Sequence, residues 1–423
     1  MRFAASIVAL SLCTINVGYA QLSNSVAIDS AGFVQSRLNK IDEVINAEIQ
    51  NGMIPGAVAL IAKDSKIAYF KSFGFSDIDT QTPMQNDDIF RLASMTKAIT
   101  SVGVMILYER GQFQLNDPIS QFIPEFTNMN VVAALDDNEE VSSIAPARKS
   151  IKIIDLLTHS SGISYPFAIS SVQKSYVNTG IIDGLTSRNI TLAAQMKLLA
   201  SQPLLFEPGS SYEYGLSTDL LGYLIEVVSG KPLAQFFTEE ITTPLGMEDT
   251  YFYLPEAKAD RLVALYAEDE DDGLQVAKGD ESNIILDNPL YPIGEVQTYF
   301  SGGAGLSSTA YDYAIFLQML LNNGELDGTR ILSRKSVELM RTARIDSNGD
   351  QLANFGLGFD ITVDLGKTGE LGSIGNYEWS GAFLTSYWLD PQENLFAVFM
   401  SQVRPSQSDI RAKFKTIVYQ ALE

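Results

Sequence analysis

Hydrophobic residues recur every three or four positions in several stretches, which is the spacing of one helix face. This pattern predicts an N-terminal helix over 33–51, ended by Asn51-Gly52, and a closing helix over 410–422. Between them it predicts helices over 94–110, 192–201, 218–229 and 232–241.

Runs rich in β-branched and aromatic residues predict strands over 57–62, 66–75, 356–363, 382–389 and 395–401. Asp64-Ser65 and residues 390–394 read as hairpin turns, and hairpins join antiparallel strands. We therefore expect an α+β fold with one antiparallel sheet built from both termini and flanked by helices. The expected domains are a sheet domain (21–85 and 300–423) and an inserted, mainly helical domain (86–299).

The first twenty residues have the layout of a secretory signal. A basic start at Arg2 precedes an apolar run over 4–12, and small residues lead to a cleavage site near Ala20. A buried N-terminal helix is the alternative. Cleavage would make the protein secreted or periplasmic and would remove Cys13, the only cysteine. The mature chain would then hold no disulfide and no cysteine metal ligand.

The net charge of the chain limits the classes of partner that it is expected to bind. The formal net charge is −22, and loss of Arg2 with the signal makes it −23. This argues against nucleic acids and anionic membranes, and we expect no membrane span. The acidic run 268–272 lacks the glutamate of a calcium loop at its twelfth position, Gly279, so we expect a solvated loop. The oligomeric state is unknown from the sequence.

The single histidine, His159, excludes sites that need two, such as HExxH zinc sites. Because the chain also has no G-x-S-x-G elbow, we expect His159 to have a structural role, with its ring bonded to loop backbone. No glycine pattern indicates a nucleotide, and we expect no metal and no cofactor.

Ser94-Met95-Thr96-Lys97 opens an apolar-periodic segment. Residues three apart share a helix face, so the hydroxyl of Ser94 and the amine of Lys97 can meet. The positive end of a helix favours the negative charge of an activated serine, and a desolvated lysine can act as its base. The alternative is a capping serine followed by a surface lysine.

Arg91-Leu92-Ala93-Ser94-Met95-Thr96-Lys97 resembles the nucleophile segment of the serine β-lactamase and DD-peptidase superfamily. It is most similar to class C β-lactamases and the related family VIII carboxylesterases. Further segments similar to that family follow in the expected order, at 155–163, 206–217, 244–250 and 302–309. The resemblance spans about residues 36–420, and it implies a β-lactamase/DD-peptidase-like fold and a serine hydrolase.

The resemblance implies that Ser94 is the acylated nucleophile, with Lys97 and Tyr214 moving its proton. Tyr212 is a rival for the tyrosine, but the count from Gly209 favours Tyr214. Leu216 stands where β-lactamases carry an asparagine that bonds the substrate amide. This departure favours the esterase branch.

Lys367-Thr368-Gly369 reads literally as the family's KTG motif, but a glycine-broken stretch follows it. Trp379-Ser380-Gly381 leads into the predicted strand 382–389 and resembles the W-x-G of family VIII esterases. We therefore expect Trp379, Ser380, Gly381 and Leu216 to contact substrate. The N–H groups of Ser94 and Ala382 would form the oxyanion hole. A tryptophan offers no charge to a substrate carboxylate.

Two features stay open. Gly302–Gly305 is interpreted as a turn before a helix cap at Ser308/Thr309 with Asp312, with close approach to the pocket as the alternative. The aromatic residues of Tyr165-Pro166-Phe167, Tyr291 and Tyr299 are either pocket walls or core.

The sequence thus predicts a secreted serine hydrolase that cleaves carboxylic esters through an acyl-enzyme on Ser94. Its expected partner is a small-molecule ester or amide substrate. One alternative is a β-lactamase or D-amino-acid peptidase/amidase with the same residues. Another is a non-catalytic binding relative.

Overall fold

The computed structural model describes residues 22, 32–186, 188–269, 273–277 and 290–423. The predicted signal peptide and cleavage site lie outside the described residues.

A seven-stranded sheet joins the two ends of the chain, in the order β12-β13-β14-β15-β1-β2-β3, and all its pairings are antiparallel. C-terminal β15 pairs with N-terminal β1, with Val58 opposite Met400. The predicted α+β fold with a sheet built from both termini is therefore confirmed. The strands are β1 (Gly56–Lys63), β2 (Lys66–Asp77), β3 (Thr82–Pro83), β12 (Asp360–Ile361), β13 (Tyr377–Gly381), β14 (Thr385–Asp390) and β15 (Leu395–Met400).

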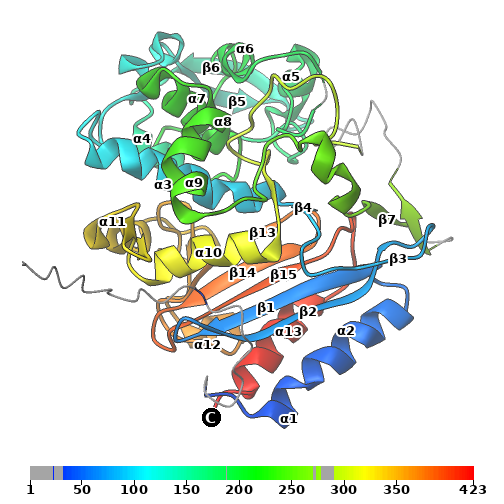
Figure 1. The fold of residues 1–423 in the computed structure, drawn as a ribbon. Helices are drawn as coiled ribbons and strands as arrows, with labels where there is room; N and C mark the ends of the chain where they lie inside the picture. Colours follow the sequence, from blue (N-terminus) through cyan, green and yellow to red (C-terminus); the bar gives the residue numbers. More distant parts are fainter. Residues whose placement is uncertain (1–21, 23–31, 187, 270–272, 278–289) are drawn as a thin grey trace, which may run out of the picture.

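Both faces of the sheet are covered (Figure 1). On one face, Ala59 and Ile61 of β1 join the core formed with α2 (Lys40–Gln50) and α13 (Ile410–Gln420). On the other, Val58 and Leu60 join the core that includes α10 (Ala310–Leu321). Because both faces are buried, β1 is a nearly continuous apolar run.

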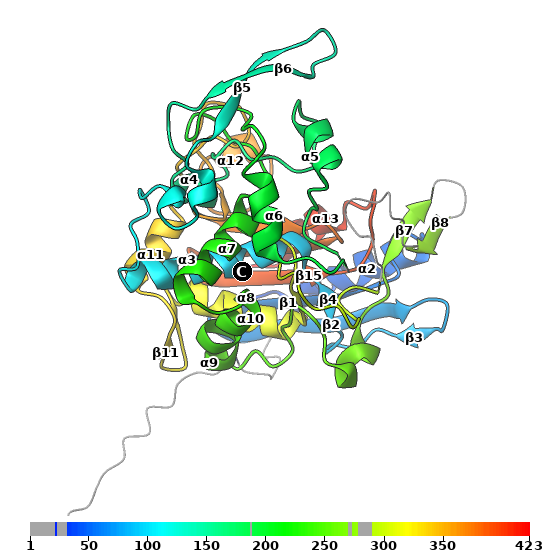
Figure 2. The same ribbon diagram turned by 90° about the horizontal axis from the view of Figure 1, so that it is seen from above.

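The helices of the middle of the chain gather beyond α10, on the side away from α2 and α13 (Figures 1 and 2). Among them, α3 packs against α7. They are α3 (Thr96–Glu109), α4 (Ile153–Leu157), α5 (Gln173–Thr179), α6 (Leu192–Leu199), α7 (Ser217–Ser229), α8 (Leu233–Phe237), a π-helical turn (Thr238–Thr242) and α9 (Thr243–Leu245).

The remaining elements are short. They are the helices α1 (Gln35–Leu38), α11 (Arg334–Met340) and α12 (Leu365–Thr368), the 3₁₀ turns Ala93–Met95, Ile119–Gln121, Pro124–Phe126 and Glu256–Arg261, and the strand pairs β4 (Phe90–Arg91) with β9 (Ser307–Ser308), β5 (Asn130–Leu135) with β6 (Val141–Pro146), β7 (Tyr266–Asp269) with β8 (Gly273–Val276), and β10 (Glu325–Leu326) with β11 (Thr329–Arg330).

Several sequence-based boundaries need correction. Only Asp360 and Ile361 of the predicted strand 356–363 form β12, because Gly358 takes a left-handed φ of 95°. The predicted strand 382–389 starts at Thr385, since the chain turns before it and Leu384 has a φ of 64°. Trp379-Ser380-Gly381 therefore ends β13 and does not open the following strand.

Two further predictions were wrong in part. The β5–β6 hairpin within the predicted helical domain was missed. Glu268 and Asp269 of the acidic run belong to strand β7, not to a loop, and the rest of the run lies outside the described residues. Within the described ranges, no helix is both long enough and apolar enough to span a bilayer. The domain boundaries stay a prediction.

Candidate active site

Ser94 lies in a 3₁₀ turn, Ala93–Met95, that runs directly into α3. Ala93 has a left-handed φ of 46°, a conformation that costs an alanine free energy. The turn aims the partly exposed Ser94 out of a buried segment and leaves it at the N-terminal end of a 14-residue helix. Negative charge on the serine oxygen is favoured at such an end.

Three side chains predicted from the sequence meet at one oxygen. The Nζ of Lys97 donates to the Oγ of Ser94 at 3.1 Å, and the Oη of Tyr214 donates to the same Oγ at 2.7 Å. Ser94 and Tyr214 are 120 residues apart in sequence. Two groups that can exchange protons therefore flank a hydroxyl, which is the arrangement of an activated serine nucleophile.

Lys97 is 2% exposed, and its amine is surrounded by groups that attract a cation. Its Nζ also donates to the carbonyl of Gly303 at 2.7 Å. It lies 4.8 Å from the centre of the Tyr214 ring and 5.6 Å from that of Tyr165. The alternative of a surface lysine is thus wrong.

Gly303 belongs to the segment that we interpreted as a turn before a helix cap. The cap is confirmed, because the side chain of Thr309 accepts from the N–H of Asp312. The interpretation of this segment as a purely structural turn was incomplete, because the Gly303 carbonyl accepts a hydrogen bond from Lys97. The cluster of glycines was the only sequence signal for this approach.

His159 supports the loop that carries Tyr214. The N–H of Gly215 donates to Nδ1 of His159 at 3.4 Å, and the carbonyl of His159 accepts from the N–H of Glu213 at 2.8 Å. Burial and the positive charge of Lys97 lower the pKa of His159, so the ring stays neutral. The predicted structural role, with the ring bonded to loop backbone, is confirmed.

Tyr212 was the alternative to Tyr214 as the tyrosine that moves the proton of Ser94. Its ring packs 5.3 Å from that of Phe355, and burial raises its pKa. No hydrogen bond joins it to Ser94 among the described residues. The geometry therefore favours Tyr214 as the proton-transfer partner.

Trp379, and not Lys367, reaches the site. The Nε1 of Trp379 donates to Tyr214 Oη at 3.4 Å, and the two rings lie 5.4 Å apart. Lys367 is on α12, where it pairs with Asp350 at 3.0 Å and lines a separate cavity of about 400 Å³. The literal KTG tripeptide is thus remote from the serine.

Gly381 brings the end of β13 against the nucleophile turn. A Cβ on Gly381 would lie 2.3 Å from the carbonyl oxygen of Leu92, so only glycine allows this approach. The next residue, Ala382, is exposed in the turn between β13 and β14. Its N–H as the second oxyanion donor stays a prediction. Ser380 precedes Gly381 and is partly exposed on the same strand.

Leu216 does not occupy the place that we expected for a substrate contact. Its side chain is fully buried in the main core, directly before α7. The expected contact needs correction, because a side chain with no exposed surface does not meet a substrate. Because leucine replaces asparagine, this position has no side-chain amide.

The aromatic residues divide into two groups. Tyr165 and Phe167 stack at 4.5 Å, and the ring of Tyr165 lies 5.4 Å from that of Tyr214, so this pair packs beside the site. Tyr291 and Tyr299 are buried, and Tyr291 donates to the carbonyl of Gly305 at 2.7 Å. These two belong to the core.

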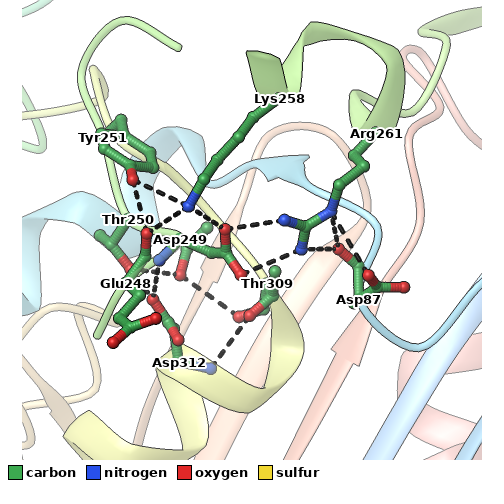
Figure 3. A network of polar contacts seen from close by, with 10 residues as sticks. Asp87, Glu248, Asp249, Thr250, Tyr251, Lys258, Arg261, Thr309 and Asp312 are labelled. Atoms are coloured by element: carbon green, nitrogen blue, oxygen red, sulfur yellow. Dashed lines mark hydrogen bonds and ion pairs between the residues drawn. The ribbon is translucent and has the colours of Figure 1, made fainter. Parts of the chain in front are cut away.

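Figure 3 shows the polar network that joins residues of the segments 244–250 and 302–309 to Asp312. Asp312 accepts from the N–H of Asp249 at 2.7 Å and from the hydroxyl of Thr250 at 2.9 Å. Lys258 and Arg261 clamp the carboxylate of Asp249 at 2.7 and 2.8 Å. The network holds the far end of the glycine segment that meets Lys97.

The chain is similar to several known proteins. Protein Rv1367c of Mycobacterium tuberculosis is 34% identical over 84% of this chain and 88% of its own. Esterase EstB of Burkholderia gladioli is 30% identical over 83% of this chain and 86% of its own. The solved structure of EstCE1, a hydrolase with promiscuous acyltransferase activity, is 28% identical, covers 91% of this chain and 99% of its own, and has a TM-score of 0.78.

A family-wide comparison gives the same result over nearly the whole chain. The family described as Beta-lactamase matches residues 41–421. This range contains every residue of the site described above. The chain therefore belongs to the beta-lactamase family and is a serine hydrolase of that superfamily.

Proposed function

We propose that the protein hydrolyses carboxylic esters of small molecules through an acyl-enzyme on Ser94. The observation that carries the proposal is that one serine oxygen accepts from both the Lys97 amine and the Tyr214 phenol. An ester needs little more than this nucleophile, a proton relay and an oxyanion hole.

In the first half of the reaction, Ser94 Oγ attacks the ester carbonyl. Its proton passes to Lys97 as the free amine, either directly or through Tyr214, which lies within hydrogen-bond distance. The N–H groups of Ser94 and Ala382 stabilise the oxyanion. Tyr214 or Lys97 then returns a proton to the departing alkoxide, so that an alcohol leaves and an ester bond to Ser94 remains.

In the second half, water attacks the acyl-enzyme. The same relay takes a proton from water and returns it to Ser94 Oγ, which releases the carboxylic acid. Every proton is handled by side chains already in contact, and the charge that develops on the carbonyl oxygen is met by backbone donors.

Two features support an ester over an anionic lactam. Trp379 stands at the site without a charge, while Lys367 pairs with Asp350 elsewhere, so no lysine of a KTG motif faces the serine. No amide stands at Leu216 to bond a lactam side chain. The similarity to an esterase, EstB, agrees with this preference.

The test is a comparison of kcat/KM for p-nitrophenyl acetate and butyrate with kcat/KM for nitrocefin. We expect ester turnover to exceed lactam turnover and to disappear in Ser94→Ala. Faster hydrolysis of nitrocefin, or of a D-alanyl-D-alanine peptide, would assign the β-lactamase or peptidase alternative in its place.

A further inference from the structure

A buried carboxylate lies directly behind the partner of Lys97. Asp219 is on α7, five residues after Tyr214, and its side chain has no exposed surface. The hydroxyl of Ser301 donates to its Oδ1 at 2.5 Å. A fully buried carboxylate is costly unless it serves the structure or the chemistry around it.

The second oxygen of Asp219 touches the segment that holds Lys97. A Cβ on Gly303 would lie 2.3 Å from Oδ2, so the carboxylate packs directly against the Cα of this glycine. On its other side, the Gly303 carbonyl accepts from Lys97 Nζ at 2.7 Å. The preceding carbonyl, of Gly302, accepts from Thr100 Oγ1 at 2.6 Å. The turn is thus fixed between Asp219 and α3.

The charges of Asp219 and Lys97 also interact electrostatically. Burial raises the pKa of Asp219, whereas the Ser301 hydrogen bond and the positive charge of Lys97 act in the opposite direction.

Other titratable groups surround the pair. Tyr214, Tyr165 and His159 face Lys97, and Asp183, Tyr165, Tyr291 and Tyr299 face Asp219. Burial raises the pKa of each of the last four and lowers that of His159. Arg404 acts on Asp183.

We propose that Asp219 is a positioning residue for the base Lys97. It fixes the Ser301–Gly303 turn so that the Gly303 carbonyl aims the amine at Ser94. This proposal rests on the proposed role of Ser94 and Lys97 in ester hydrolysis.

The test measures the rate of phosphonylation of Ser94 by a fluorophosphonate between pH 5 and 9. Asp219→Ala removes the acceptor of the Ser301 hydroxyl, so the phosphonylation rate should fall at least about tenfold, whereas Asp219→Asn keeps an acceptor and should recover most of the rate. Gly303→Ala displaces the carbonyl that holds Lys97, so the phosphonylation rate should fall at least about tenfold. Asp390→Asn, which changes a fully buried carboxylate at the far end of β14, is the matched control.

A folded Asp219→Ala protein that is phosphonylated at the wild-type rate overturns the proposal. An unchanged phosphonylation rate in Gly303→Ala also overturns the positioning role, and this variant decides the matter if Asp219→Ala does not fold. A wild type that is phosphonylated but does not hydrolyse esters refutes ester hydrolysis alone. A wild type that is not phosphonylated refutes both proposals.

Discussion

The phenol oxygen of Tyr214 lies 2.7 Å from the hydroxyl oxygen of Ser94 and 3.4 Å from the indole nitrogen of Trp379. If Tyr214 moves protons, Tyr214→Phe should lower kcat for p-nitrophenyl butyrate by about 10²–10⁴-fold and change KM by less than about threefold. Tyr212→Phe is the matched control and should stay within about threefold of wild type. Equal losses in the two variants would contradict the assignment.

Trp379 should determine which substrate charge the site accepts. Trp379→Lys places an ammonium where the described site has an indole, so the preference for a p-nitrophenyl hemisuccinate over the butyrate should rise by about tenfold. Trp379→Phe retains an aromatic wall without a charge and should leave that preference unchanged. The ratio of the two kcat/KM values is the measurement, and an unaltered ratio in the lysine variant would refute this role.

Leu216→Asn introduces the asparagine that β-lactamases carry at this sequence position, but its side chain should not reach the substrate. Because Leu216 is fully buried, the amide would lie in apolar core and should lower the free energy of unfolding by about 2–4 kcal/mol. We expect no gain in nitrocefin hydrolysis. Urea unfolding and nitrocefin turnover measure the two effects, and a stable variant with new lactam activity would show that residue 216 reaches the substrate.

Asp312, in the network of Figure 3, should make stability depend on pH. Burial raises the pKa of Asp312 to about 6 from an ordinary 3.8. The folded state therefore holds this proton more tightly than the unfolded state. Its stabilisation is fully present below about pH 4 and is lost as the pH rises through 6.

Asp312→Asn should remove up to about 3 kcal/mol of the fall in unfolding free energy between pH 4 and 7. Part of the fall will remain, because burial raises the pKa of Asp88 to about 6 as well. Urea titrations at pH 4, 5.5 and 7 provide the measurement. A slope identical to that of wild type would show that Asp312 does not titrate in this range.

We also propose that residues 1–20 direct export. N-terminal sequencing of protein recovered outside the cytoplasm should begin at Gln21. Replacing Leu10 and Leu12 in the apolar run by lysine should keep the protein in the cytoplasm. Exported protein that retains Met1 would contradict cleavage near Ala20.

The main features of the fold follow from local sequence. The continuous apolar run of β1 and the turn at Asp64-Ser65 predict the central hairpin, because a strand buried on both faces needs no polar alternation. The length of β12 was overestimated, because neighbouring glycines shorten this strand to two residues. Such breaks depend on packing that a local pattern does not contain.

Local sequence likewise predicts some of the site residues and misses others. Ser94 and Lys97 are three residues apart on one helical segment, and motif spacing identifies Tyr214. In contrast, Gly303 lies 206 residues from Lys97 and acts through its backbone carbonyl, which no side-chain motif reveals. Asp219 resembles any helical aspartate in the sequence, and only its burial against Gly303 distinguishes it.

The most direct test of the central claim is peptide mass spectrometry of protein treated with a fluorophosphonate, alongside hydrolysis of p-nitrophenyl butyrate. The account predicts one adduct, on Ser94, that abolishes ester hydrolysis in proportion to labelling, and neither adduct nor activity in Ser94→Ala. An unlabelled Ser94, or ester hydrolysis that persists in Ser94→Ala, would contradict it.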